Sequence, residues 1–202
     1  MRRDYGVNIS CDKAWCAREA EYDLTRGTSE YSYSILHAYE EMLKIENPGT
    51  VFKIKLEDDV HFKYMFMALG PCIRDFTSYW PLIIVDGSHL KGKYKGTMLV
   101  AVSMDGNNQL YPLAYVMVDN ETDRSWKWFM LNLKCSIGEP DNLVFVSDRM
   151  VSISNVIRAF FPTSFHGLCT WHIEQNLITN FKDSTIVGIF RYAARAFRMT
   201  EF

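Results

Sequence analysis

The sequence lacks any long hydrophobic run and has almost no excess charge of either sign. No apolar stretch approaches the ~18 residues that a membrane span needs. Lysine and arginine total 22 against 24 aspartate and glutamate residues, so the chain is not the strongly basic body of a protein that binds nucleic acid by charge alone. The five cysteines are an odd number and widely scattered, which favours a reducing compartment over a disulfide framework.

Several common catalytic motifs are also missing. The chain contains no GxSxG, no HExxH, no phosphate-binding P-loop and no dinucleotide fingerprint. Serine or cysteine nucleophilic chemistry therefore has no support. Disorder is excluded as the main state, because 48% of the residues are hydrophobic and 14% are aromatic. The composition therefore indicates an ordinary globular protein with a sizeable core.

The pattern changes near residue 80, which predicts two regions, 1–80 and 81–202. Apolar residues recur at helical spacing over 12–27 and 32–49, and the second stretch is closed by Asn-Pro-Gly. Residues 51–58 alternate as in a half-buried strand. We therefore expect 1–80 to be a small, mainly helical connecting region that precedes the main domain.

Region 81–202 predicts an α/β domain. The expected strands are 81–86, 97–105, 109–119, 142–148 and 163–172, and the expected helices are 125–138, 153–162, 173–181 and 184–198. Strands joined by short turns must be antiparallel, whereas strands joined through helices should be parallel. The prediction is a mixed five-strand sheet with flanking helices, in the element order of a ribonuclease H-like fold. Pro112 indicates an edge position or a bulge in its strand.

Two acids follow buried strands of this expected sheet. Asp86 and Asp148 each come after a short run of apolar β-formers, at the edge where open α/β sheets place their ligands. If the two strands are parallel neighbours, both carboxylates can reach one divalent cation, and hard oxygen ligands suit Mg²⁺ or Mn²⁺. The plain structural alternative is that polar turn residues simply follow strand ends.

A Cys-x-x-His segment, Cys169 and His172, stands at the next strand–helix junction. Structural zinc takes four ligands and no second pair follows, so a buried cysteine and a hydrogen-bonded histidine are favoured over a zinc site. Glu174 lies two residues on. It can join an acid cluster, but a solvated first-turn glutamate is the simpler interpretation.

Basic residues near these acids are candidate DNA contacts. Alternating lysines follow Asp86, and arginines at helical spacing form a stripe on the last helix. Solvated surface positions are the alternative for both sets. The candidates are Lys91, Lys93, Lys95, Arg191, Arg195 and Arg198.

Four blocks in order resemble a known family. They are DGSHLKG (86–92), NETDRSWKWF (120–129), SD (147–148) and CTWH (169–172). Together they resemble the transposase domain of plant Mutator-like elements (MULE, MuDR type), from about residue 81 to the end. The preceding region resembles the segment before that domain in the same proteins. Far-red impaired response regulators, which are domesticated relatives, share much of the pattern.

The resemblance implies a ribonuclease H-like DDE core that cuts and joins DNA with Mg²⁺ or Mn²⁺. Asp86 and Asp148 match the first two catalytic acids, and Cys169 and His172 match a motif that shapes the site. The third acid, a glutamate, lies in the family beyond a helical insertion of which 173–202 resembles only the start. We therefore expect an incomplete, inactive transposase core in this chain.

Two alternatives stay open. One is a non-catalytic, domesticated transposase remnant that binds DNA or protein in the nucleus. The other is a metal-dependent nuclease on the same fold, with Glu174 or Glu121 as third acid near the aspartates. The resemblance also implies a nuclear location, DNA partners (transposon ends and target), association with a full-length transposase, and no membrane contact.

Overall fold

The structure is a computed structural model that describes residues 9–91 and 95–196. The chain divides into two compact units between Glu46 and Asn47. Within the described residues, no helix is both long and apolar enough to cross a lipid bilayer.

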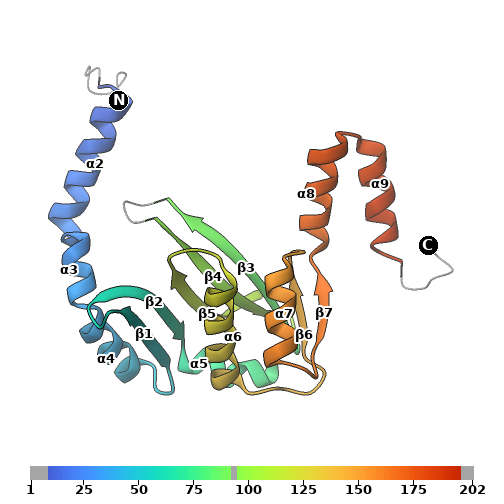
Figure 1. The fold of residues 1–202 in the computed structure, drawn as a ribbon, viewed down its shortest axis with the longest axis horizontal. Helices are drawn as coiled ribbons and strands as arrows, with labels where there is room; N and C mark the ends of the chain where they lie inside the picture. The colour runs from blue at the N-terminus through green and yellow to red at the C-terminus, as the bar shows by residue number, and fades with distance from the viewer. Residues whose placement is uncertain (1–8, 92–94, 197–202) are drawn as a thin grey trace. The chain divides into compact units, whose positions relative to one another are not determined.

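The first unit consists of the helices α2 (Cys11–Arg26), α3 (Ser29–Ser34) and α4 (Leu36–Glu46) (Figure 1). The side chain of Ser10 caps α2 by accepting from the backbone N–H of Lys13, which satisfies one of the free donors at the helix start. At the other end Gly27 takes a φ of 80°, a conformation that favours glycine. The helix predicted at 32–49 is interrupted at Ile35, so it forms α3 and α4.

The second unit is a mixed α/β structure built on one sheet. Its strands are β1 (Val51–Glu57), β2 (His61–Ala68), β3 (Leu82–Leu90), β4 (Gly96–Met104), β5 (Leu110–Val118), β6 (Val144–Ser147) and β7 (Phe165–Leu168). Its helices are α5 (Gly70–Asp75), the 3-10 helix η1 (Phe76–Ser78), α6 (Asp123–Ile137), α7 (Val151–Phe160), α8 (Thr170–Phe181) and α9 (Ser184–Ala193).

The described strands form a seven-stranded sheet in the order β1-β2-β5-β4-β3-β6-β7. β3, β4 and β5 are antiparallel, while β6 and β7 continue from β3 in parallel, as the turn and helix connections predict. The predicted number of five strands is wrong. The β1–β2 hairpin adds two strands, because β2 pairs with β5 through Met65–Met67. The observed division of the chain therefore precedes the predicted one at 80/81.

A bulge lies where Pro112 interrupts the β4–β5 ladder. Ala101 pairs with Ala114, but Val102 pairs with Pro112, so Leu113 is the extra residue. Proline has no N–H to donate to a ladder. Because β5 is flanked by β2 and β4, the bulge alternative is confirmed and the edge alternative is not.

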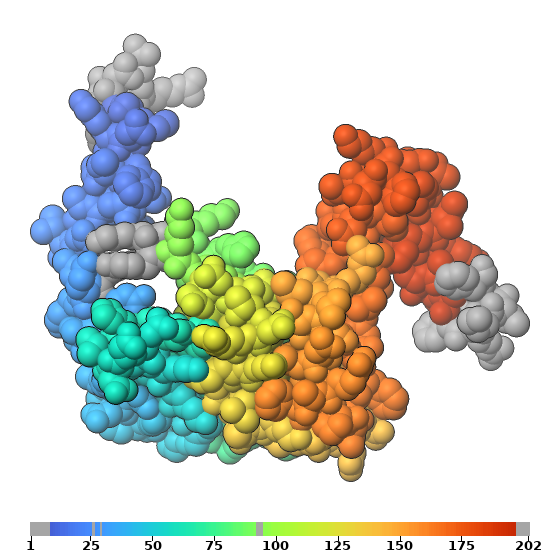
Figure 2. Space-filling view, viewed as in Figure 1, coloured from blue at the N-terminus to red at the C-terminus, as the bar shows by residue number. Residues whose placement is uncertain are grey.

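Helices α6 and α7 pack against each other and close one face of the sheet (Figure 1). In the space-filling view, the yellow and orange atoms of α6 and α7 lie side by side over this face (Figure 2). The fully buried side chains between these helices and the sheet include Phe66, Ile83 and Leu99 of the strands, and Trp126 and Phe129 of α6. This apolar layer fixes β3, the strand that carries Asp86.

A hydrogen-bonded tie, formed by Lys134, Glu139 and Thr163, holds the end of α6 to the segment that leads into β7. Lys134 Nζ donates to Glu139 Oε2 at 2.7 Å and to the carbonyl of Phe160 at 2.5 Å. Glu139 Oε1 accepts from the backbone N–H and the hydroxyl of Thr163. The tie thereby positions the chain just before β7, the strand that leads to Cys169.

This tie predicts an acid-dependent loss of stability. The hydrogen bonds from Lys134 and then Thr163 hold the pKa of Glu139 at about 2, below its usual 4.5. A lowered carboxyl pKa contributes stability above the unfolded value, and this is lost as pH falls from about 4.5 towards about 2. In urea unfolding at about pH 5 and pH 3, the parent should lose more stability than Glu139→Gln. Equal losses would contradict the role of this carboxylate.

Candidate functional site

Asp86 and Asp148 lie at neighbouring positions on two parallel strands. β3 and β6 pair with Ile84 opposite Val146. Continuing this register by two residues places Asp86 opposite Asp148, which directly follows β6. Residues in register on parallel strands share a face of the sheet. The register therefore brings the two acids to the same part of the sheet, with Asp86 inside β3 and not at a strand end as predicted, while metal binding itself stays a prediction.

Backbone groups hold one oxygen of each carboxylate. Asp86 Oδ1 accepts from the N–H of Gly87 at 2.8 Å. Asp148 Oδ1 accepts from the N–H of Met150 at 2.9 Å, and Met150 is the residue just before α7. The Asp86 side chain is 52% exposed, and Asp148 is half-buried. In each aspartate, the second carboxylate oxygen, Oδ2, therefore takes no part in these backbone hydrogen bonds.

His172 stands beside Asp86. β7 pairs in parallel with β6, and the N–H of Cys169 donates to the carbonyl of Ser147 at 2.7 Å. This places His172 in the first turn of α8, with its Nε2 4.0 Å from Asp86 Oδ2. Its Nδ1 is buried and has no hydrogen-bond partner among the described residues. The prediction of a buried cysteine and a hydrogen-bonded histidine is therefore wrong: Cys169 is half-buried, and His172 is oriented by packing and by the Asp86 charge without a hydrogen bond among the described residues.

A second histidine supports the strand end next to Asp148. Ser147 is buried, and its hydroxyl donates to the carbonyl of Asp148 at 2.8 Å. The same hydroxyl lies 2.9 Å from His166 Nε2, so His166 must be the donor in that bond. Burial, followed by the charge of Arg158, lowers the pKa of His166. His166 lies on β7 opposite Phe145 of β6, a position that depends on the sheet register and that no local sequence pattern predicts.

Glu121 is brought against the residue that follows Asp86. Thr122 and Ser125 form a capping box at the start of α6, which fixes the backbone around Glu121. The indole Nε1 of buried Trp126 donates to Glu121 Oε1 at 3.1 Å. A Cβ added at Gly87 would lie 3.0 Å from Glu121 Oε2. Gly87 therefore leaves room for this carboxylate on the strand that carries Asp86.

Glu174 is not part of an acid cluster, and its interpretation as a solvated glutamate is corrected. It forms a bidentate ion pair with Arg191 of α9. Arg191 Nε donates to Glu174 Oε2 at 2.9 Å, and Arg191 Nη2 donates to Glu174 Oε1 at 2.5 Å. The hydrogen bond from Arg191 lowers the pKa of Glu174. This pair joins α8 to α9, so Arg191 already has a carboxylate partner.

The other basic residues predicted as DNA contacts lie on different elements. Lys91 follows β3 and Lys95 precedes β4, and both are exposed. Arg195 is exposed after α9. Lys93 and Arg198 lie outside the described residues. The described arginines of the stripe thus belong to α9 and the residues after it, whereas Lys91 extends the strand that carries Asp86.

The donor set at the Asp86 edge fits a hard divalent ion with few protein ligands. Within 9–91 and 95–196, no group of three or more His, Cys, Asp or Glu side chains is placed to hold a metal. Mg²⁺ commonly binds through one or two carboxylates, with water and substrate phosphate completing its shell. Asp86 and Asp148 match that smaller requirement. Two carboxylates do not supply the four ligands that a structural zinc site takes.

Comparison with known proteins gives a consistent family relationship. Residues 82–176 match the sequence model of the MULE transposase domain. The chain is 23% identical to Protein FAR1-RELATED SEQUENCE 4 of Arabidopsis thaliana over 163 residues, which are 78% of this chain and 22% of that protein. It is 20% identical to Protein FAR-RED IMPAIRED RESPONSE 1 of the same plant, over 71% of this chain and 17% of that protein. The chain therefore spans about a fifth of the length of these relatives.

The matched segment contains the features described above. It runs from the start of β3 into α8, and so includes Asp86, Glu121, Asp148 and the Cys169–His172 pair. The predicted resemblance is thereby confirmed: residues 82–176 match the MULE transposase domain.

Proposed function

We propose that the second unit is a transposase-derived DNA-binding core of ribonuclease H-like fold, which binds Mg²⁺ or Mn²⁺ between Asp86 and Asp148. The observation that carries the proposal is the parallel β3–β6 pairing, whose last pair, Ile84 and Val146, lies two residues before Asp86 and Asp148. The strand order β5-β4-β3-β6-β7, with antiparallel and then parallel pairing, supports the fold assignment. The match to the MULE transposase domain supports DNA as the partner and the nucleus as the place of action.

The chain's own residues supply binding and orientation in this proposal. Asp86 and Asp148 offer the ligand oxygens, and their backbone hydrogen bonds fix the direction of each carboxylate. His172 stands beside Asp86, where it limits how that side chain turns. A bound divalent ion would supply Lewis-acid activation of a phosphodiester.

A metal-dependent gain in thermal stability tests this proposal. Two carboxylates at one edge repel each other when no cation is present, and an ion that binds only the folded state stabilises it. Mn²⁺ at ten times its dissociation constant adds about 1.4 kcal/mol, which corresponds to a rise in Tm of about 3 to 6 °C for a chain of this size. Melting should be followed with and without millimolar Mn²⁺.

The control is the double variant Asp86→Asn, Asp148→Asn, which keeps the side-chain shape and removes the charge. We expect its Tm to be insensitive to Mn²⁺. A rise of the same size in the parent and in the variant, or no rise in the parent, would rule out a shared metal site.

A non-catalytic DNA- or protein-binding role is the second candidate. The observation that favours it is that the two glutamates considered as third acid are already engaged: Glu174 pairs with Arg191 and Glu121 accepts from Trp126. A core with two free aspartates holds a second ion poorly. Mn²⁺ binding by the parent chain supports the transposase-derived metal site. Absence of Mn²⁺ binding by the parent favours this second role.

A further inference from the structure

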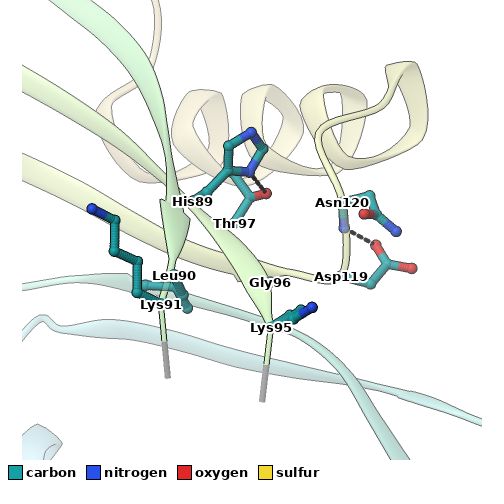
Figure 3. Close-up of a pocket in the computed structure, with 8 residues that line it drawn as sticks. All are labelled: His89, Leu90, Lys91, Lys95, Gly96, Thr97, Asp119 and Asn120. Atoms are coloured by element: carbon teal, nitrogen blue, oxygen red, sulfur yellow. Dashed lines mark hydrogen bonds between the residues drawn. The ribbon is translucent and has the colours of Figure 1, made fainter. Parts of the chain in front are cut away.

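A hollow of about 410 Å³ lies beyond the metal-site end of β3. Its walls come from three places in the chain: the end of β3, the start of β4 and the connection from β5 to α6 (Figure 3). The polar lining residues are His89, Lys91, Lys95, Thr97, Asp119 and Asn120. This volume is within the range of small-ligand sites.

Two ammonium groups give the hollow a positive side. Lys91 and Lys95 stand at the two strand ends (Figure 3). Both side chains are exposed, and the structure gives neither of them a carboxylate partner among the described residues. An unpaired ammonium group is a flexible point charge that suits a phosphate oxygen. The lysine side of the hollow is thus free to take an anion.

The histidine wall is fixed in place by the sheet. His89 and Thr97 are directly paired across β3 and β4. His89 Nδ1 lies 3.2 Å from the hydroxyl of Thr97, and Thr97 is buried. One ring nitrogen is therefore committed, which leaves Nε2 for a further hydrogen bond.

The facing wall has a different character. Asp119 Oδ1 accepts from the N–H of Asn120 at 2.7 Å. Burial, and then the charge of Asp119, raise the pKa of the Tyr64 phenol, which places the Asp119 carboxylate near Tyr64 of β2. An anion in the hollow is thus attracted by one wall and repelled by the other, so it should lie against Lys91 and Lys95.

The spacing from Asp86 relates this hollow to the candidate metal site. Lys91 is five residues after Asp86 along β3 and its continuation. At about 3.3 Å per residue, that is about 17 Å. Because each strand of B-DNA carries one phosphate per about 3.4 Å of helix axis, the hollow and the Asp86–Asp148 edge are far enough apart to contact different phosphates of one duplex.

We propose that this hollow holds a backbone phosphate of DNA, separate from the phosphate at the Asp86–Asp148 edge. This inference rests on the proposed function and extends it by naming a second contact with the same duplex. Lys91 and Lys95 bind the phosphate, and His89 borders it. Asp119 repels the phosphate and so weakens the contact.

Salt-dependent DNA binding tests the assignment. Binding of a fluorescent 20-base-pair duplex is measured by anisotropy across about 50 to 200 mM KCl, for the parent and for Lys91→Gln, Lys95→Gln. We expect the slope of log K against log[KCl] to become less negative by about 1 for each lysine–phosphate pair that the substitutions remove. The matched control, Lys53→Gln, Lys127→Gln, removes the same charge from exposed positions on β1 and α6, and its slope should equal that of the parent.

Two further arms sharpen the result. Asp119→Asn should tighten binding of the same duplex, because it removes the repelling charge. Inorganic phosphate at 1 mM and constant ionic strength should leave DNA binding unchanged, because a single phosphate lacks the other contacts of the duplex.

Three outcomes would overturn the assignment: no binding by the parent, equal slopes in the lysine variant and the parent, or equal losses in the two lysine pairs. Displacement of DNA by 1 mM phosphate would overturn it too, in favour of a small-anion site. The Mn²⁺ melting experiment uses no DNA, so failure of the metal site is read separately from failure of this phosphate contact.

Discussion

Gly70→Ala is expected to destabilise the second unit by about 3 kcal/mol, because the new methyl group has no space. A Cβ at this position would lie 2.1 Å from the carbonyl oxygen of Pro48 and 2.8 Å from the backbone carbon of Gly49. Both are backbone atoms, so no side-chain rotation relieves the overlap. The segment after β2 must then move away from the turn before β1.

The same position is held by hydrogen bonds that such a movement would break. The N–H of Gly70 donates to the hydroxyl of Thr50 at 3.0 Å. Arg74 of α5 donates to the carbonyl of Pro48 at 2.8 Å. These bonds attach the start of α5 to the turn that leads into β1. Loss of this attachment should loosen the β1–β2 hairpin before it affects β3 and β6.

The matched control is Gly106→Ala in the β4–β5 turn. A Cβ there meets no atom within 4 Å, so the substitution should be neutral, or stabilising by up to about 1 kcal/mol. Urea unfolding gives both free energies. A loss at Gly70 no larger than that at Gly106 would show that the approach of the two segments is not required for folding.

The hairpin that Gly70 secures is only half predicted from the sequence: β1 corresponds to the strand expected at 51–58, whereas β2 and its pairing are not predicted. Residues 61–68, HFKYMFMA, are apolar on both faces, and such a run does not distinguish a strand from a buried helix. The turn before it uses Asp58 and Asp59, with φ of 53° and 59°, in place of the usual Asn-Gly signal. Pairing of β2 with β5 joins segments about fifty residues apart, which no local pattern encodes.

The Asp86–Asp148 edge is predictable because its determinants are local. Each acid follows its own apolar run, Asp86 within β3 and Asp148 directly after β6, and the connection through α6 makes β3 and β6 parallel. The neighbours of these acids are not predictable in the same way. Glu121 approaches Gly87, and Glu174 pairs with Arg191, only through the packing of helices against the sheet and each other.

Trp126→Ala is expected to cost about 3 to 5 kcal/mol of stability, the usual range for a large buried aromatic side chain. The Trp126 side chain is fully buried. Its ring packs 5.7 Å from that of Phe129, within the layer between α6 and the sheet. Removal leaves a cavity in that layer and also leaves Glu121 Oε1 without its indole donor. Urea unfolding measures the loss.

Two control variants separate the causes. Trp80→Ala removes the same side chain from a position that is 56% exposed, and it should cost less than about 1 kcal/mol. Trp126→Phe fills most of the cavity but cannot donate to Glu121, so it isolates the hydrogen bond, which is worth about 1.5 to 3 kcal/mol when the acceptor is charged. If Trp126→Phe is as stable as the parent, the indole bond does not hold Glu121. If it is destabilised while the Mn²⁺ response is unchanged, Glu121 supports β3 structurally and takes no part in binding the metal.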